Sequence, residues 1–172
     1  MTEQCRKLQN IDLKATYIGK DQAENEAIEN AQFDFVFGSP ESVLGNSKWR
    51  EVWKSPCYQD KLRYIVVDEA HTVLLWGEQS NKEEPFREWF GKIGELRSLC
   101  PAAQMIALTA TSGPSQRRRI MKSLCFRISS KIITDSPDRA NIKITSVCIP
   151  NNDNLDIIFS WLVHSLKSLK EK

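Results

Sequence analysis

The chain has 172 residues, enough for one domain with a sizeable core, and its net charge of +2 does not by itself indicate a nucleic-acid binder. No apolar stretch reaches the roughly 20 residues of a membrane helix, and the first residues lack the apolar segment of a signal peptide. Five scattered cysteines without a CxxC pair indicate a reducing compartment, so we expect cytoplasm or nucleus rather than secretion or a membrane.

Strand-like and helix-like segments alternate along the chain, which is typical of an α/β fold with a parallel sheet flanked by helices. The first predicted elements are a helix over 2–10, a strand over 15–18, a helix over 21–31 and a strand over 33–37. Ser39 then suits a helix N-cap, Pro40 the first helical position and Glu41 the positive end of the helix dipole. The helix that follows carries Trp49 and Trp53 on one face, where we expect core packing.

The run Tyr64-Ile65-Val66-Val67 contains four strand-forming residues without a charge, which predicts a strand buried on both faces. The later predicted elements are an aperiodic segment over 72–85, a helix over 86–99, a strand over 105–108, a basic helix over 114–124, strands at 132–133 and 142–149, and a helix with an apolar stripe over 155–169. The basic run Arg117-Arg118-Arg119 with Lys122 is typical of a solvated helix face, and we leave it out of the predicted site.

Two adjacent carboxylates, Asp68 and Glu69, follow the 64–67 strand. Ligands of open α/β sheets bind beyond the carboxyl ends of the strands. We therefore interpret Asp68 as the residue that holds Mg²⁺, through water, and Glu69 as the residue that orients and deprotonates the attacking water in ATP hydrolysis. The alternative is a surface pair that caps the next helix, since acidic residues suit a helix N-terminus.

Three strand ends carry polar motifs, and a parallel sheet brings such ends to one edge. The motifs are Ser39-Pro40-Glu41, Asp68-Glu69-Ala70-His71 and Ala107-Leu108-Thr109-Ala110-Thr111-Ser112. They resemble a Ser-Pro-Glu stretch, motif II and motif III of the superfamily 2 helicases, most closely the RecQ-type DNA helicases. The RecQ branch is further indicated by Trp76-Gly77, Phe86-Arg87 and the stretch 138–142.

The resemblance implies a RecA-like P-loop NTPase lobe that uses ATP and Mg²⁺. Asp68 would bind Mg²⁺ and Glu69 would be the base for water. His71, Thr109 and Thr111 would link the state of the γ-phosphate to DNA contacts, since imidazole and hydroxyl groups relay hydrogen bonds. The alternatives are β-branched filler at a strand end for the two threonines and a helix-turn hydrogen bond for His71.

By the same resemblance, residues 72–89 correspond to an aromatic-rich loop that senses single-stranded DNA. Trp76, Phe86 and Arg87 would contact nucleic acid, and the Ser39-Pro40-Glu41 stretch would contribute to the same interface. For Trp89 a core position is the better interpretation. The chain departs from the family here, because the usual Trp-Gly-His-Asp-Phe-Arg run is interrupted by an insert that contains Glu83 and Glu84. These carboxylates would repel phosphate.

No Gly-x-x-x-x-Gly-Lys-Thr loop occurs in the 172 residues. Met1 falls where the family's motif Ia begins, so we expect a lobe incomplete on its N-terminal side that hydrolyses ATP negligibly alone. The expected domains are 1–134 (second half of the first lobe, motifs Ia/Ib, II and III), 135–152 (linker and strand) and 153–172 (first helix of a truncated second lobe). An unpaired edge at 105–108 and an uncovered final helix predict marginal stability.

The leading functional hypothesis is a RecQ-like ATP-dependent DNA helicase, working 3′ to 5′ on single-stranded DNA and duplex junctions. The alternative is a non-catalytic remnant that binds nucleic acid or a partner. A metal hydrolase built on Asp68, Glu69 and His71 is disfavoured, because the other histidine, His164, lies on the predicted last helix.

Overall fold

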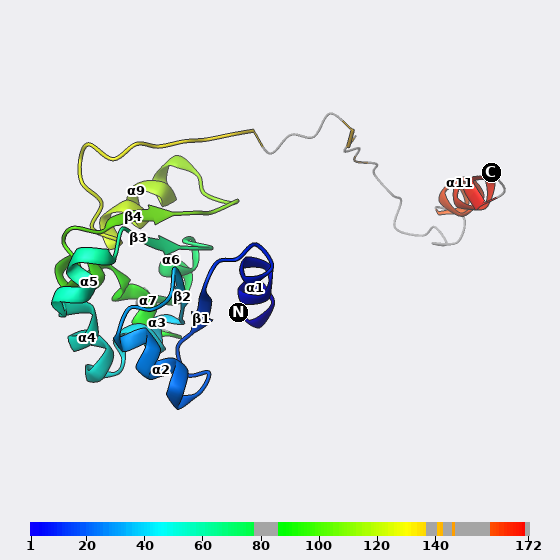
Figure 1. The fold of residues 1–172 in the computed structure, drawn as a ribbon. Coiled ribbons are helices and arrows are strands. Elements are labelled where there is room, and N and C mark those ends of the chain that lie inside the picture. The colour runs from blue at the N-terminus through cyan, green and yellow to red at the C-terminus, as the bar shows by residue number, and fades with distance from the viewer. Residues whose placement is uncertain (78–85, 137–140, 143–145, 147–158, 171–172) are drawn as a thin grey trace. The chain divides into compact units, whose positions relative to one another are not determined.

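The computed structural model describes residues 1–77, 86–136, 141–142, 146 and 159–170 (Figure 1). These form two units, Met1–Ile133 and Thr134–Lys172. In the second unit the described helix is α11 (Ser160–Lys170), with Trp161, Val163 and Leu166 exposed. Most of the strand expected over 142–149 and the start of the last predicted helix fall outside the described residues. None of the described helices has the length and apolar character needed to cross a membrane.

The first unit is an α/β structure with two small parallel sheets. Its strands are β1 (Ala15–Tyr17), β2 (Phe35–Phe37), β3 (Tyr64–Val67) and β4 (Gln104–Ala107). Strand β1 pairs with β2, with Ala15 opposite Phe35, and β3 pairs with β4, with Tyr64 opposite Gln104. Within the described residues the two pairs are not joined into one sheet. The parallel pairing that the alternation predicts is therefore present, in two separate pieces.

Short helices cover these sheets. They are α1 (Thr2–Gln9), α2 (Gln22–Glu29), α3 (Pro40–Leu44), α4 (Ser47–Lys54), α5 (Pro56–Lys61), α6 (Thr72–Gly77), α7 (Glu88–Gly91), the 3₁₀ helix η1 (Ile93–Glu95), α8 (Leu96–Leu99) and α9 (Pro114–Ser123). The predicted N-cap is confirmed, because the Ser39 hydroxyl accepts a hydrogen bond from the Ser42 backbone N–H at 3.3 Å and Pro40 is the first residue of α3. The expected helix after it is wrong in one respect: it is two helices, since the Asn46 side chain caps a new one.

The core lies where helices α3 to α9 meet the covered face of the β3–β4 sheet. The predicted core pair Trp49 and Trp53 is confirmed, with stacked rings at a centroid distance of 5.6 Å. Trp53 meets Tyr58 edge to face at 4.9 Å, and the Tyr58 hydroxyl donates to the Ile28 carbonyl at 2.6 Å. The buried Tyr58 hydroxyl is thus hydrogen-bonded, as burial requires.

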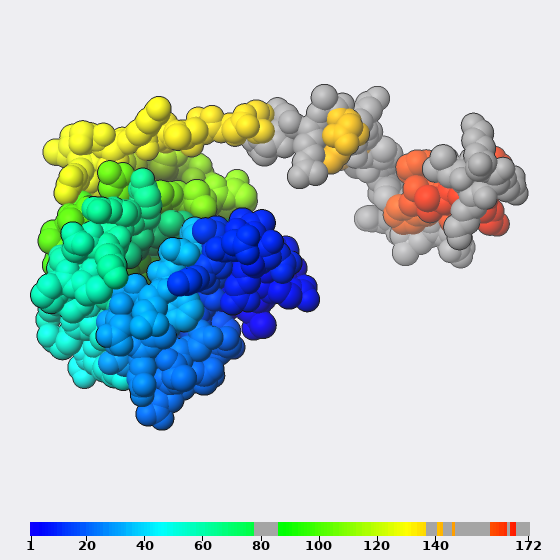
Figure 2. All heavy atoms as spheres, viewed as in Figure 1, coloured from blue at the N-terminus to red at the C-terminus, as the bar shows by residue number. Residues whose placement is uncertain are grey.

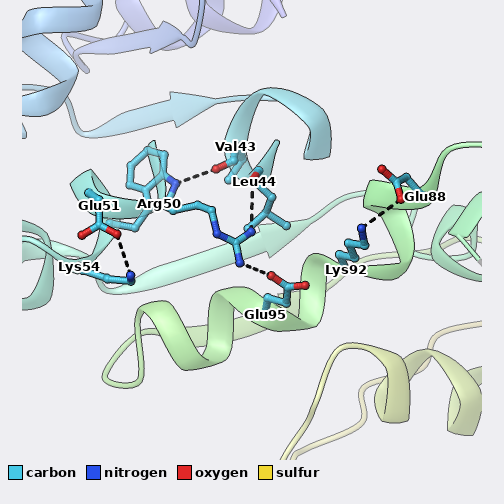
Figure 3. Close-up of polar contacts among 9 residues, drawn as sticks. Val43, Leu44, Arg50, Glu51, Lys54, Glu88, Lys92 and Glu95 are labelled. Atoms are coloured by element: carbon cyan, nitrogen blue, oxygen red, sulfur yellow. Dashed lines mark hydrogen bonds and ion pairs between the residues drawn. The ribbon is translucent and has the colours of Figure 1, made fainter. Parts of the chain in front are cut away.

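Polar contacts join the short helices end to end (Figure 3). The Arg50 guanidinium donates to the Leu44 carbonyl at 3.2 Å and pairs with Glu95. The Trp53 indole N–H donates to the Val43 carbonyl at 3.0 Å. These donors satisfy carbonyls at the end of α3 that have no partner in the helix itself, and they tie α4 to both α3 and η1.

The prediction that the 64–67 strand is buried on both faces is wrong. Tyr64 and Val66 are 57% and 55% exposed, and Ile106 and Leu108 are also exposed. In the register of the pair, Val66 lies opposite Ile106. Helices cover only the face of Ile65 and Val67, whereas the other face is open within the described residues. An all-apolar strand therefore marks two apolar faces without showing that both are covered.

The predicted strand at 132–133 is also absent. Ile132 and Ile133 are exposed and have no assigned secondary structure, and within the described residues they have no ladder partner. An extended apolar pair becomes a strand only when a neighbour supplies hydrogen bonds.

The predicted helix over 86–99 is α7, η1 and α8 in succession, broken near Gly91 and Gly94. At Gly94 a Cβ would lie 2.3 Å from the Ser123 carbonyl oxygen, so the close packing of this segment on α9 requires glycine.

Candidate functional site

The turn after β3 holds the two predicted catalytic carboxylates in a strained conformation. Glu69 has a φ of 47°, in the left-handed region that non-glycine residues rarely adopt. The turn is fixed by three hydrogen bonds: Asp68 Oδ1 accepts from the Glu69 N–H at 2.9 Å, and the Glu69 carbonyl accepts from the Thr72 N–H and hydroxyl at 2.9 and 2.7 Å. Asp68 and Glu69 remain exposed. Strain of this kind persists where surrounding contacts hold it, and it is common at functional sites.

His71 connects this turn to the end of β4. Its Nδ1 lies 3.2 Å from the Thr109 hydroxyl and 3.2 Å from Glu69 Oε2. Nδ1 is thus within reach of both an accepting carboxylate and a hydroxyl that can donate or accept. The two loops are also joined by the backbone, since the Ala70 N–H donates to the Leu108 carbonyl at 2.8 Å. The expected meeting of motif II and motif III residues is therefore present in the structure.

Thr111 lies further along the second loop, where its N–H donates to the Thr109 hydroxyl at 3.3 Å. It also lines a pocket of about 390 Å³ between these loops and α9, together with His71, Leu74, Leu75, Ser112, Gly113 and Gln116. Sequence reasoning missed Leu74 and Leu75, because α6 is too short for helical periodicity to be visible. We call Asp68, Glu69, His71, Thr109 and Thr111 the carboxylate–histidine cluster.

The donor set suits magnesium bound together with a nucleotide. Protein sites for Mg²⁺ commonly supply one or two carboxylates and leave the remaining positions to phosphates and water. Asp68 and Glu69 provide such a pair, whereas the described part of the chain has no group of three or more side chains able to hold a metal on its own. A self-contained metal-hydrolase site is therefore not supported by the described residues.

A second cluster forms around Arg87. Its Nε donates to Glu41 Oε1 at 2.8 Å, and its guanidinium lies 5.7 Å from the Trp76 ring centroid and 5.0 Å from that of Phe90. Trp76 meets Phe90 edge to face at 5.0 Å and Phe86 at 6.3 Å. Phe86 is 80% exposed, so it is not a core residue. We call these five residues the arginine–aromatic cluster.

Two glycines make this cluster possible. A Cβ on Gly77 would lie 2.1 Å from the Gly91 nitrogen, and one on Gly91 would lie 2.5 Å from the Gly77 carbonyl oxygen. Helices α6 and α7 therefore touch backbone to backbone, and the Arg87 N–H donates to the Trp76 carbonyl at 3.0 Å. This contact brings the Trp76 and Phe90 rings together. Phe90 was missed in the sequence, where its place in an apolar helical pattern gave no sign of a surface role.

The Glu41 carboxyl is ionised in this setting. Burial works against ionisation, but hydrogen bonds from its own backbone, Ser39 and Arg87 outweigh that effect and lower the pKa of Glu41 below its usual value. The ion pair with Arg87 is partly exposed on both sides. Arg87 is thus held against the aromatic rings by a charged partner from the Ser-Pro-Glu stretch.

The predicted site residues therefore fall into two groups rather than one. Asp68, Glu69, His71, Thr109 and Thr111 lie together at the ends of β3 and β4. Glu41 instead contacts Arg87 beside Trp76, while Ser39 and Pro40 begin α3. The acidic residues Glu83 and Glu84 and most of the 138–142 stretch lie outside the described residues.

The sequence of the chain matches known proteins. Residues 1–120 match the DEAD/DEAH box helicase family. The chain is 29% identical over 151 residues to an ATP-dependent DNA helicase RecQ of Haemophilus influenzae, covering 84% of this chain and 22% of the relative. It is 27% identical over 151 residues to the RecQ-like DNA helicase BLM of Xenopus laevis, covering 83% and 11%. It is 40% identical over 89 residues to the ATP-dependent DNA helicase Q5 of Rattus norvegicus, covering 52% and 8%.

The chain spans about a fifth or less of the length of these relatives. The match covers both clusters, because motif II, motif III and the Trp76–Arg87 segment all lie within residues 1–120. The chain belongs to the DEAD/DEAH box helicase family and, within it, to the RecQ type.

Proposed function

We propose that this chain supplies the water-activating and DNA-sensing parts of an ATP-dependent DNA helicase of RecQ type, working 3′ to 5′ on single-stranded DNA and duplex junctions. The observation that carries the proposal is the contact of His71 with both Glu69 and Thr109. It joins an exposed carboxylate pair to the adjacent strand end, as an ATP-hydrolysing site requires. A protein that handles DNA with reduced cysteines fits the nucleus or the cytoplasm.

In this proposal Asp68 holds Mg²⁺ through water and Glu69 accepts the proton of the attacking water. Mg²⁺ bound with ATP supplies positive charge against the phosphates. His71 orients the Glu69 carboxylate through Nδ1, and the same ring contacts Thr109, so a change at either position reaches the other. Thr111 is connected to this relay through Thr109.

The arginine–aromatic cluster is the proposed contact for single-stranded DNA. Trp76 and Phe86 offer ring faces for base stacking, and Arg87 offers a charge for phosphate. The Glu41 carboxylate occupies Nε of Arg87 in the present structure. DNA binding therefore requires the guanidinium to use its other donors or to leave Glu41.

The second candidate is a non-catalytic module that binds nucleic acid or a partner. It is favoured by the insert that contains Glu83 and Glu84 in the aromatic-rich segment, since carboxylates repel phosphate. The two candidates differ in one respect, which is whether Glu69 acts on water once a phosphate-binding loop is present.

A chimera tests this difference. We expect residues 1–172 alone to hydrolyse ATP at the background rate, and a chimera with the preceding phosphate-loop segment of a RecQ relative to show DNA-stimulated hydrolysis. Glu69→Gln in the chimera should lower the rate by at least about 100-fold, because water loses its general base. Lys61→Gln, on the exposed end of α5, is the control. DNA-stimulated hydrolysis that survives Glu69→Gln would contradict the proposed role.

A further inference from the structure

The charge of the chain is unevenly distributed. Residues 96–134 contain seven of the 24 basic residues and none of the 22 acidic ones. The rest of the chain thus has 17 basic residues and all 22 acidic ones. The near-neutral net charge of the whole chain therefore conceals one basic segment. Six of the seven lie in or just after α9, and we call them the basic surface: Arg117, Arg118, Arg119, Lys122, Arg127 and Lys131.

Helix α9 presents its charges outward. Ile120 and Leu124 are buried in the core, and the helix packs against α6 on that side. Arg118, Arg119 and Lys122 lie on the exposed side. Because the apolar face of α9 is already used inside the protein, the helix has no free apolar face with which to enter a lipid bilayer.

The segment after α9 turns back and adds two more charges. Cys125 has a φ of 53°, and the Phe126 N–H donates to the Met121 carbonyl at 2.9 Å, a left-handed helix ending. Arg127 then donates to the Pro101 carbonyl at 3.5 Å. Figure 2 shows residues 127–133, in yellow, at the surface along one edge of the first unit. Arg127 and Lys131 are both exposed there.

Three charges of the basic surface differ from several other helix lysines, which pair with a carboxylate. Lys7 pairs with Glu3, Lys20 with Glu24 and Lys92 with Glu88, each four residues away in sequence. Within the ranges that the structure describes, no carboxylate pairs with Arg118, Lys122 or Lys131.

The arrangement also costs helix stability. Arg118 and Lys122 are like charges four residues apart, which disfavours a helix by about 0.2–0.5 kcal/mol. Arg117 lies in the first turn of α9, where positive charge opposes the helix dipole. A surface that serves only for solubility does not need like charges four residues apart or a positive charge near the start of a helix. A bound polyanion would offset both repulsions.

We propose that the basic surface binds the phosphate backbone of nucleic acid, as a contact separate from the arginine–aromatic cluster. That the polyanion is DNA rests on the proposed function. Arginine and lysine contacts to phosphates fix position without reading bases, so the binding is independent of sequence. It releases counterions from the nucleic acid, so its strength falls steeply with salt.

The test measures binding of residues 1–172 to a fluorescein-labelled single-stranded DNA 20-mer across a salt series. The variant Arg118→Gln/Lys122→Gln/Lys131→Gln should lower affinity at least about tenfold at low salt. It should also flatten the plot of log K against log salt by about 0.7 for each phosphate that is no longer neutralised. The control Arg63→Gln/Lys14→Gln/Lys61→Gln removes the same number and types of exposed charge elsewhere. Its slope should match that of the wild type. Circular dichroism checks that both variants keep their helices.

Trp76→Ala separates this proposal from the proposed function. It should weaken binding by removing a stacking surface while leaving the salt slope unchanged. A flattened slope in the triple variant supports the basic surface whatever Trp76→Ala does. If Trp76→Ala has no effect on binding, that result counts against the arginine–aromatic cluster and leaves the basic surface supported. An unchanged slope in the triple variant, or an equal loss of affinity in the control, overturns the basic surface. So does binding to phosphatidylserine vesicles through these residues without binding to DNA.

Discussion

At the scale of single residues, Arg87 shows how one side chain combines roles that the sequence keeps apart. Trp76, Phe86 and Arg87 were predicted to lie together from their resemblance to an aromatic-rich loop. The resemblance also assigned Glu41 to this interface, but it did not predict the contact with Arg87, from which 46 positions separate Glu41. The ion pair between them depends on how α3 and α7 are packed, which a sequence pattern does not contain.

The lowered pKa of Glu41 gives this ion pair a defined dependence on pH. A carboxyl with a lowered pKa contributes stability above its unfolded pKa, and that contribution is lost as pH falls through the lowered value. We expect the ¹³C shift of the Glu41 carboxyl to titrate below the usual glutamate value of about 4.3. Arg87→Gln should raise its midpoint. An unchanged midpoint in that variant would show that Ser39 and the backbone alone hold the charge.

Cys100 provides an opposite case. Burial raises the pKa of its thiol to about 11, and its Sγ lies 3.7 Å from the Trp53 carbonyl. A raised pKa means that the stabilising neutral form is fully present below the unfolded value of about 8.5 and is lost as pH rises towards 11. The free energy of unfolding in urea should fall over that range by roughly 1–3 kcal/mol more in the wild type than in Cys100→Ala. Cys125→Ala, at an exposed thiol, should keep the wild-type fall.

At the scale of elements, the sequence predicts the type of an element better than its continuity. The helices over 2–10, 21–31 and 114–124 and the positions of four strands are confirmed within one or two residues. The helices expected over 40–54 and 86–99 are broken, and α6 was not predicted. Glycines lie at these breaks. Gly77 and Gly91 are needed because two helices touch there backbone to backbone, and only the folded chain shows that contact.

The contact between α6 and α7 can be tested by adding one carbon atom. Gly77→Ala would place a Cβ 2.1 Å from the Gly91 nitrogen, and backbone cannot yield as a flexible side chain does. We expect a loss of about 1–3 kcal/mol in the free energy of unfolding and a change in Trp76 fluorescence. Gly113→Ala is the control, because its Cβ would meet nothing within 4 Å. Gly113 is the N-cap of α9, where alanine is less favourable than glycine, so the effect of this control should stay below about 1 kcal/mol. Equal effects of the two substitutions would show that the close approach is not needed.

At the scale of the whole molecule, the sequence predicted the position of the candidate site better than the exposure of the surfaces around it. The meeting of His71 with Thr109 follows from two motifs at the ends of parallel strands, a rule of the fold class. The three motifs do not form one site, because the Ser39–Glu41 stretch follows β2, which belongs to the other strand pair. Whether an apolar strand is covered depends on elements that can lie anywhere in a chain, so the open face of Tyr64 and Val66 had no local signal.

That open face predicts how the chain behaves in solution. Tyr64, Val66, Ile106 and Leu108 form an exposed apolar surface on β3 and β4, and within the described residues the outer edge of β4 has no partner. Such a surface favours association through burial of apolar area and edge pairing. We expect residues 1–172 to associate with rising concentration, measured by sedimentation velocity, and to melt at a modest temperature.

Lysine substitutions on the two faces of β3 separate association from folding. Val66→Lys places a charge on the open face, so it should shift the chain towards monomer and change the free energy of unfolding by less than about 0.5 kcal/mol. Val67→Lys places the same charge on the covered face, next to the core, and should unfold the protein because a buried ammonium has no partner there. If Val66→Lys unfolds the chain as Val67→Lys does, then Val66 is covered in solution. If the wild type is also monomeric at all concentrations, then what covers Val66 is not the same face of a second molecule.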